Sequence, residues 1–127
     1  MKRLFNIILA VALISIALVS CTERIFLEFD QPSCYCEASS EGVTLHTNMP
    51  IEFLGVCTDN GANYLDCSYR GNSLECNGGW FTASCSKNGN EVLVSLNDNS
   101  STSDREIKIQ VISKGMAATC TLVQSGR

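Results

Sequence analysis

"EVLVSLNDNSSTSDREIKIQVI" (residues 91–112) contains two short runs in which apolar and polar residues alternate. The apolar positions are Val92, Val94 and Leu96 in the first run and Ile107, Ile109 and Val111 in the second. Because successive side chains of a β-strand point to opposite faces, the pattern predicts two strands, each with one face on a core and one in water. Ser95 and Lys108 fall on the solvent faces, and the polar residues 97–104 predict a loop.

The same kind of run recurs through the rest of the chain. Further short strands are predicted at residues 34–38, 43–47, 51–57, 64–69, 81–86 and 116–124. Clusters of Gly, Asn, Asp and Ser between them indicate turns, most strongly "TDNGAN" at 58–63. No segment after the N-terminal apolar run keeps a 3.6-residue period. Short alternating strands with frequent turns predict an all-β fold, an antiparallel sandwich or barrel.

Residues 78–126 also show a specific order of features. A strand led by tryptophan is followed by a turn, an alternating valine strand, a polar loop with an arginine, an Ile-x-Ile strand and a last strand that ends in glutamine. These features fall on Trp80, Val92, Val94, Leu96, Asn99, Arg105, Ile107, Ile109 and Gln124. Their order and spacing resemble the BACON domain, an immunoglobulin-like module common in exported Bacteroidetes lipoproteins, and the resemblance spans roughly residues 34–126.

The resemblance implies an immunoglobulin-like antiparallel β-sandwich. The family's first hairpin usually carries a double glycine, where this chain has Gly42-Val43, and many cysteines are unusual for the family. The family name reflects a proposed carbohydrate role, but many such domains look like spacers or stalk pieces. The resemblance therefore implies the fold more strongly than the ligand.

The N-terminus predicts export and lipidation. Lys2 and Arg3 precede an almost wholly apolar run, residues 4–19, which is shorter than the ~20 residues of a spanning helix. Leu18-Val19-Ser20-Cys21 resembles the bacterial lipobox, whose cysteine becomes the lipid-bearing N-terminus. We therefore expect a lipoprotein signal helix at 1–20 and Cys21 as the lipidation site; the alternative is an ordinary signal peptide with a chance cysteine.

The remaining chain divides into a tether and one domain. Residues 21–33 comprise the lipidated cysteine and a short tether, part of which is apolar enough to dock, and residues 34–127 form the BACON-like β-sandwich domain. After loss of Lys2 and Arg3, seven basic and thirteen acidic residues leave a net charge of −6. An acidic chain without a basic cluster argues against nucleic acid as a partner.

Seven cysteines remain after Cys21. They are Cys34, Cys36, Cys57, Cys67, Cys76, Cys85 and Cys120. Such a density in an exported small domain predicts a disulfide framework of three bridges with one cysteine unpaired, and the sequence does not choose the pairing. A metal or redox role for Cys34-Tyr35-Cys36 is the alternative, but no second C-x-C or C-x-x-C completes a set of four ligands.

Three aromatic residues are candidates for stacking on a sugar ring: Tyr64, Tyr69 and Trp80. Core packing is the alternative for each of them, and for Trp80 the family position favours it. His46, the only histidine, has the opposite parity to Val43 and Leu45 and is expected to be an exposed strand residue, not a catalytic base.

The remaining polar candidates point to no cofactor. Asn97, Asp98, Asn99 and Asp104 carry oxygen ligands suited to calcium, but their spacing fits a polar loop better. We find no catalytic constellation and predict no metal and no cofactor.

Together these features predict a non-enzymatic, lipid-anchored module or spacer of a Gram-negative cell envelope, attached to the outer membrane. Glycan or mucin binding is the first hypothesis for its function. A structural or assembly role in contact with another envelope protein is the alternative. Whether the domain faces the periplasm or the cell surface is left open.

Overall fold

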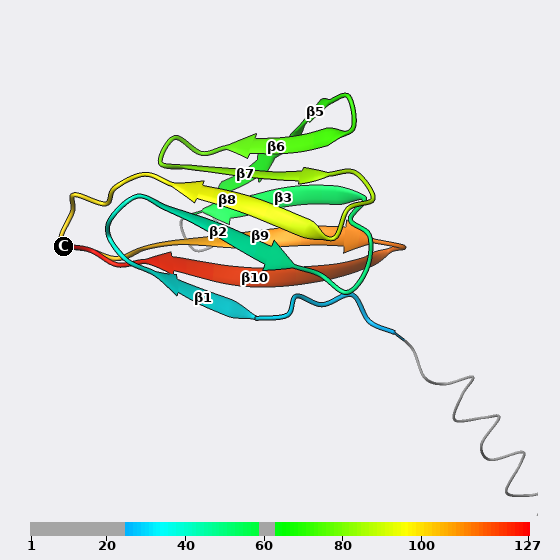
Figure 1. Cartoon of the computed structure of the whole chain (residues 1–127), viewed down its shortest axis with the longest axis horizontal. Coiled ribbons are helices and arrows are strands. Elements are labelled where there is room, and N and C mark those ends of the chain that lie inside the picture. Colours follow the sequence, from blue (N-terminus) through cyan, green and yellow to red (C-terminus); the bar gives the residue numbers. More distant parts are fainter. Residues whose placement is uncertain (1–24, 59–62) are drawn as a thin grey trace, which may run out of the picture.

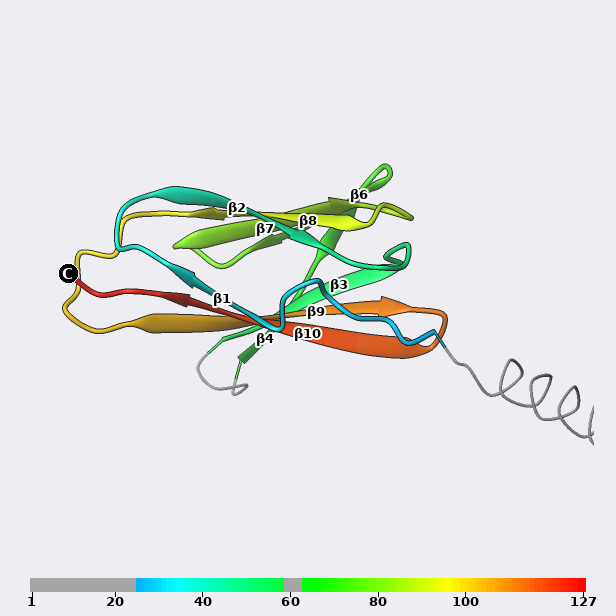
Figure 2. The same ribbon diagram turned by 60° about the horizontal axis from the view of Figure 1, so that its bottom comes forward.

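The computed structural model describes residues 25–58 and 63–127, which form ten β-strands in two sheets (Figure 1). The strands are β1 Ser33–Cys36, β2 Glu41–His46, β3 Phe53–Thr58, β4 Asn63–Asp66, β5 Ser68–Arg70, β6 Ser73–Asn77, β7 Phe81–Ser86, β8 Glu91–Leu96, β9 Arg105–Ser113 and β10 Met116–Gln124. One sheet has the order β1-β10-β9-β3-β4 and the other β2-β8-β7-β6-β5. The sheets face each other as two layers (Figure 2).

This strand order defines an immunoglobulin-like β-sandwich. β3, β9 and β10 correspond to strands C, F and G of that fold, and β2, β8 and β7 correspond to strands B, E and D. All pairs are antiparallel except β1 with β10, which run parallel with Cys34 opposite Leu122. The expectation of an all-β immunoglobulin-like sandwich is therefore confirmed.

Most predicted strands are present, with two errors in the middle of the chain. The run predicted at 64–69 is two strands, β4 and β5, which belong to different sheets. The sequence analysis predicts no strand at β6, because Ser73–Asn77 lies between two turn clusters. The crossing from one sheet to the other takes place at Cys67, a step that local alternation does not reveal.

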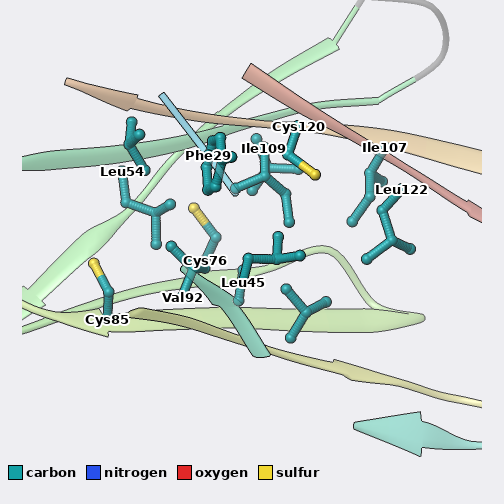
Figure 3. Packing of buried hydrophobic residues seen from close by; sticks show 14 of the residues in the cluster. Phe29, Leu45, Leu54, Cys76, Cys85, Val92, Ile107, Ile109, Cys120 and Leu122 are labelled. Carbon is teal, nitrogen blue, oxygen red and sulfur yellow. The ribbon is translucent and has the colours of Figure 1, made fainter. Parts of the chain in front are cut away.

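The core lies between the sheets and has the predicted parity. β8 alternates between exposed and buried residues along its whole length, with Val92, Val94 and Leu96 buried and Ser95 exposed. In β9, Ile107, Ile109 and Val111 are fully buried, whereas Lys108 is exposed. These side chains interdigitate with those of the opposite sheet, including Leu45 and Leu122 (Figure 3).

The segment before β1 is part of the folded unit. Leu27 and Phe29 are buried in the core, and Phe29 forms an isolated bridge with Thr47. The Asn48 side chain accepts a hydrogen bond from Glu28 N (2.9 Å) and donates one to Phe26 O (2.7 Å). The docking expected for the apolar part of the tether is therefore confirmed for Leu27 and Phe29.

The signal helix predicted at 1–20 and the lipidation site Cys21 lie outside the described residues. Within the described part of the chain, no helix is long and apolar enough to cross a membrane.

The parity of β8 and β9 yields a direct test. Val94→Asp should abolish cooperative unfolding, because it buries a charge without a partner, whereas Ser95→Asp should be nearly silent. Ile109→Ala should lower the free energy of unfolding by about 2–5 kcal/mol, and Lys108→Ala should change it by less than about 0.5 kcal/mol. Thermal and urea melts measure all four; damage at Ser95 and Lys108 instead would mean that the faces are exchanged.

Candidate functional site

The β6–β7 turn places Trp80 at the end of the sandwich where the C-terminus lies. Gly79 N donates to Asn77 Oδ1 (3.0 Å), and Gly79 adopts a φ of 90°, which disfavours a side chain. A Cβ on Gly78 would lie 2.1 Å from the Phe81 ring, so this position requires glycine. Trp80 then packs edge-on against Phe81, with ring centroids 5.0 Å apart.

Arg105, the first residue of β9, covers the other aromatic surface. Its guanidinium carbon lies 4.2 Å from the centroid of the Trp80 ring, a cation–π contact. Arg105 Nη2 donates to the carbonyl oxygens of Asn97 (2.8 Å) and Asp98 (3.2 Å). Partial burial lowers the pKa of Arg105 from its ordinary value, but the value is so high that the group stays charged.

Gln124 joins three parts of the chain at this end. Its side chain is fully buried; Oε1 accepts from Arg105 Nε (2.8 Å), and Nε2 donates to Asn97 O (2.8 Å) and Ala38 O (3.3 Å). Asn97 in turn donates from its backbone to Trp80 O (2.9 Å). We call Trp80, Asn97, Arg105 and Gln124 the polar cluster.

The loop 97–104 lies at the same end of the molecule and is held there by hydrogen bonds. The buried Asn99 side chain donates to Ser103 O (2.9 Å) and Ser125 O (3.1 Å). Asp98 Oδ1 accepts from both the backbone and the hydroxyl of Ser40, which lowers the pKa of Asp98. Asp104 accepts from Gly126 N (2.9 Å). The oxygen atoms considered for calcium therefore serve the loop itself.

The polar cluster is internally satisfied. Among the described residues, no buried side-chain nitrogen or oxygen lacks a hydrogen-bond partner. One face of the Trp80 ring is occupied by Arg105, which leaves less aromatic surface for a sugar. This geometry supports a structural role for the four residues and the core-packing interpretation of Trp80.

The structure does not bring the candidate aromatics Tyr69 and Trp80 together. Tyr69, with 51% of its surface exposed, lies in the edge strand β5 opposite Leu74, at the far end of β6 from Trp80. Tyr64 has its backbone in β4, and its side chain lies outside the described part. Tyr35, which the sequence analysis does not single out, is 79% exposed on β1. The C-x-C motif could have predicted this exposure, because alternation in a strand places Tyr35 on the face opposite Cys34 and Cys36.

One disulfide joins Cys67 to Cys76, with the Cα atoms 4.4 Å apart. Cys67 is the single residue between β4 in one sheet and β5 in the other. Ser68 pairs with Glu75, so the same antiparallel register places Cys67 directly opposite Cys76. The bridge therefore fastens the chain at the point where it crosses between the sheets.

Within residues 25–58 and 63–127, five cysteines remain as thiols, and three of them lie close together. Cys34, Cys36 and Cys120 lie on the inner face of β1 and β10, and Cys34 and Cys36 form a side-chain hydrogen bond. Burial, with a smaller contribution from Cys34, raises the pKa of Cys36 to about 12. Burial likewise raises the pKa of Cys120 to about 11, and that of Cys85 to about 11.

The expectation of three bridges is not met, and for Cys57 and Cys85 the geometry gives the reason. Cys57 pairs with the exposed Lys108 on the outer face of its sheet, whereas Cys85 points inward from the other sheet. Two cysteines cannot be bridged without moving the backbone when one points away from the core and the other, in the facing sheet, points into it. Within residues 25–58 and 63–127, no three His, Cys, Asp or Glu side chains are placed to hold a metal ion.

His46 is an exposed strand residue, as its parity predicted. Its Nδ1 lies 3.6 Å from Glu91 Oε1 on the outer face of the sheet. It borders a cavity of about 100 Å³ that is also lined by Phe29 and Cys34. This volume is small against the ~300–1,000 Å³ of pockets that hold drug-sized ligands.

No protein-family model and no curated protein matches this sequence. Among solved structures, the chain is similar to a protein from Bacteroides thetaiotaomicron determined by NMR, with 16% identity, a TM-score of 0.59, and coverage of 82% of this chain and 90% of that one. It is also similar to a chimeric titin Z1Z2 protein that carries a decorin peptide (11% identity, TM-score 0.48, coverage 84% and 98%) and to the titin M3 domain (10%, 0.46, 82% and 99%). At these identities the likeness concerns the fold.

Gln124→Leu tests the structural role of the polar cluster. The substitution leaves Asn97 O and the Arg105 Nε–H with fewer partners, and each buried group left unpaired costs about 1–3 kcal/mol. We expect a clear fall in the free energy of unfolding in urea melts. Gln110→Leu on the outer face of β9 is the matched control and should change stability by less than about 0.5 kcal/mol. Equal stability of the two variants would contradict this role.

The thiols yield a second test. Intact mass should fall below the fully reduced value by one pair of hydrogens, from Cys67–Cys76. Iodoacetamide at about pH 8, near the ordinary pKa of a free cysteine, should modify the half-buried Cys34 and Cys57 in the folded protein. Cys36, Cys85 and Cys120 should react only after denaturation, because they are buried and protonated at that pH. A mass deficit of three pairs of hydrogens would contradict the single bridge and support the framework of three bridges.

The same thiols make stability depend on alkaline pH. Their pKa values are raised on folding from 9.0 to about 11 or 12, so above pH 9 the unfolded chain releases protons more readily. The free energy of unfolding should therefore fall as the pH rises from about 9 to 11. Urea melts of the chain and of a Cys85→Ser variant, compared at both pH values, measure the effect; a flat profile would contradict it.

Proposed function

We propose that this chain is a lipid-anchored, non-enzymatic module of the cell envelope that holds a compact sandwich close to the outer membrane. The immunoglobulin-like fold supports a module or spacer role. The lipobox-like Leu18–Cys21 and the resemblance to the BACON domain support the anchor and the envelope location.

One observation carries the proposal: the folded unit begins within a few residues of the anchor cysteine. Leu27 and Phe29 are buried, so only residues 22–26 separate Cys21 from the first core residue. A long flexible tether would suit a domain that searches for a distant ligand. A short docked segment suits a domain mounted on the membrane, which presents its far end to a neighbouring envelope protein.

The polar cluster supports the same proposal. Three of its residues, Trp80, Arg105 and Gln124, are features of the BACON resemblance, and they close one end of the sandwich in this chain. Shared residues with a structural task support a resemblance of fold. They do not favour a shared ligand site at that end.

The experiment is membrane partition of Cys21→Ala. The unchanged chain should be processed and recovered in the detergent phase, whereas Cys21→Ala should lose both processing and lipid. Cys57→Ala, which removes a cysteine from the outer face of β3, is the control and should partition like the unchanged chain. Recovery of the unchanged chain in membranes with its N-terminal segment intact would show that residues 4–19 form a true anchor helix.

Glycan binding is a second candidate, supported by the exposed ring of Tyr69. Tyr69 pairs with Leu74, so its ring lies on the face of β5 opposite the Arg70–Glu75 ion pair (3.8 Å), and the aromatic surface itself carries this candidate. Tyr69→Ala should abolish binding on a glycan array if this surface holds a sugar. Tyr35→Ala, which removes an exposed tyrosine from another strand, should leave binding unchanged. Absence of signal from the unchanged domain would favour the spacer role.

A further inference from the structure

The end of the sandwich opposite the polar cluster exposes apolar side chains. Ile25 is 74% exposed and Phe26 65%, although Leu27 directly after them is buried. Phe53, at the start of β3, is 52% exposed. In Figure 1 the segment that begins at residue 25 leaves the sandwich at one end, and the C-terminus lies at the other.

The position of Phe26 is set by hydrogen bonds. Asn48 holds the carbonyl of Phe26 and the N–H of Glu28 with its side chain, and its own N–H donates to Glu28 O (3.2 Å). The two buried side chains that follow, Leu27 and Phe29, fix the direction of the segment. Phe26 is therefore held at the end of the molecule with Ile25 directly before it, even though both side chains are exposed.

Two turns lie at the same end. The β7–β8 turn reaches it through Asn88 N to Ile51 O (2.8 Å), and the β9–β10 turn through Lys114 N to Glu52 Oε2 (3.1 Å). Lys114 and Glu52 carry opposite charges, so this end is not a uniformly basic surface. A partner that fits it would have to accept apolar side chains and not depend on anionic groups.

The length of chain before this end limits where it can lie. Four Cα–Cα steps join Cys21 to Ile25, which allows at most about 14 Å, and one more step reaches Phe26. The polar interfacial region on each side of a bilayer is itself about 5–8 Å thick. If the acyl chains of Cys21 are in the bilayer, Ile25 and Phe26 start within reach of its surface.

We propose that Ile25 and Phe26 form a lipid contact that stands the sandwich end-on against the bilayer. The inference rests on the lipid anchor of the proposed function and adds a second contact to it. A phenylalanine or isoleucine removed from water gains free energy in the interfacial region as it does in a core. The polar cluster and the C-terminus then point away from the membrane.

The test is fluorescence quenching by brominated lipid. The chain has one tryptophan, Trp80, at the far end, so it supplies an internal reference. The acylated full-length mature protein and its Phe26→Trp and Tyr35→Trp variants are reconstituted into phosphatidylcholine vesicles, with and without bromine on the acyl chains. Phe26→Trp should lose most of the fluorescence that the new tryptophan adds, while the unchanged protein and Tyr35→Trp should be unaffected by bromine.

Each other outcome has a defined meaning. If the Phe26→Trp variant binds vesicles but its added fluorescence is not quenched, the lipid contact is wrong and the anchor stands. If Tyr35→Trp is quenched as strongly as Phe26→Trp, the domain lies on a sheet face and the end-on arrangement is wrong. A blue shift of the added emission of Phe26→Trp without quenching points to a second copy at this surface and also overturns the proposal. If the protein does not bind vesicles, the proposed function itself fails.

Discussion

The burial of alternate side chains between two facing sheets is the constraint on which the rest of this structure depends. β8 and β9 lie in the interior of their sheets, with neighbours on both sides, and each buries every second residue. Their inner faces supply Val92, Val94, Ile107 and Ile109 to one core. Because a shift of register by one residue would turn these side chains to water, the pairing of the strands and the burial of the core specify each other.

Different interactions close the two ends of the sandwich. At one end the loops β1–β2 and β8–β9 and the end of β10 meet, and their backbone carbonyls need donors. Arg105 and Gln124 supply these donors, and the Trp80 ring covers the charge. At the other end the segment before β1 closes the core with Leu27 and Phe29. The first end is therefore closed by side-chain hydrogen bonds, and the second combines apolar burial with the hydrogen bonds of Asn48.

The cysteines show that strand topology decides which of them form a disulfide and which stay as thiols. The Cys67–Cys76 bridge lies where the chain leaves one sheet for the other, between β4 and β5, which are both edge strands. Cys34, Cys36 and Cys120 share a buried face, and the raised pKa values of Cys36 and Cys120 keep these two thiols protonated and unreactive. Reactivity in this chain is thus set by burial and strand position, and not by the number of cysteines.

The sequence by itself determined the strand class, the inward faces of β8 and β9, and the exposure of His46, because side-chain alternation is a local property of a strand. It also marked Trp80, Asn99, Arg105 and Gln124 through their order and spacing. Only the tertiary structure decided that β4 and β5 belong to different sheets, that β1 pairs in parallel with β10, and that Cys67 meets Cys76. It also decided that Arg105 covers Trp80 while Tyr69 lies elsewhere. These outcomes depend on which distant strands become neighbours, and a pattern with a period of two residues fixes the face of each side chain but not its partner.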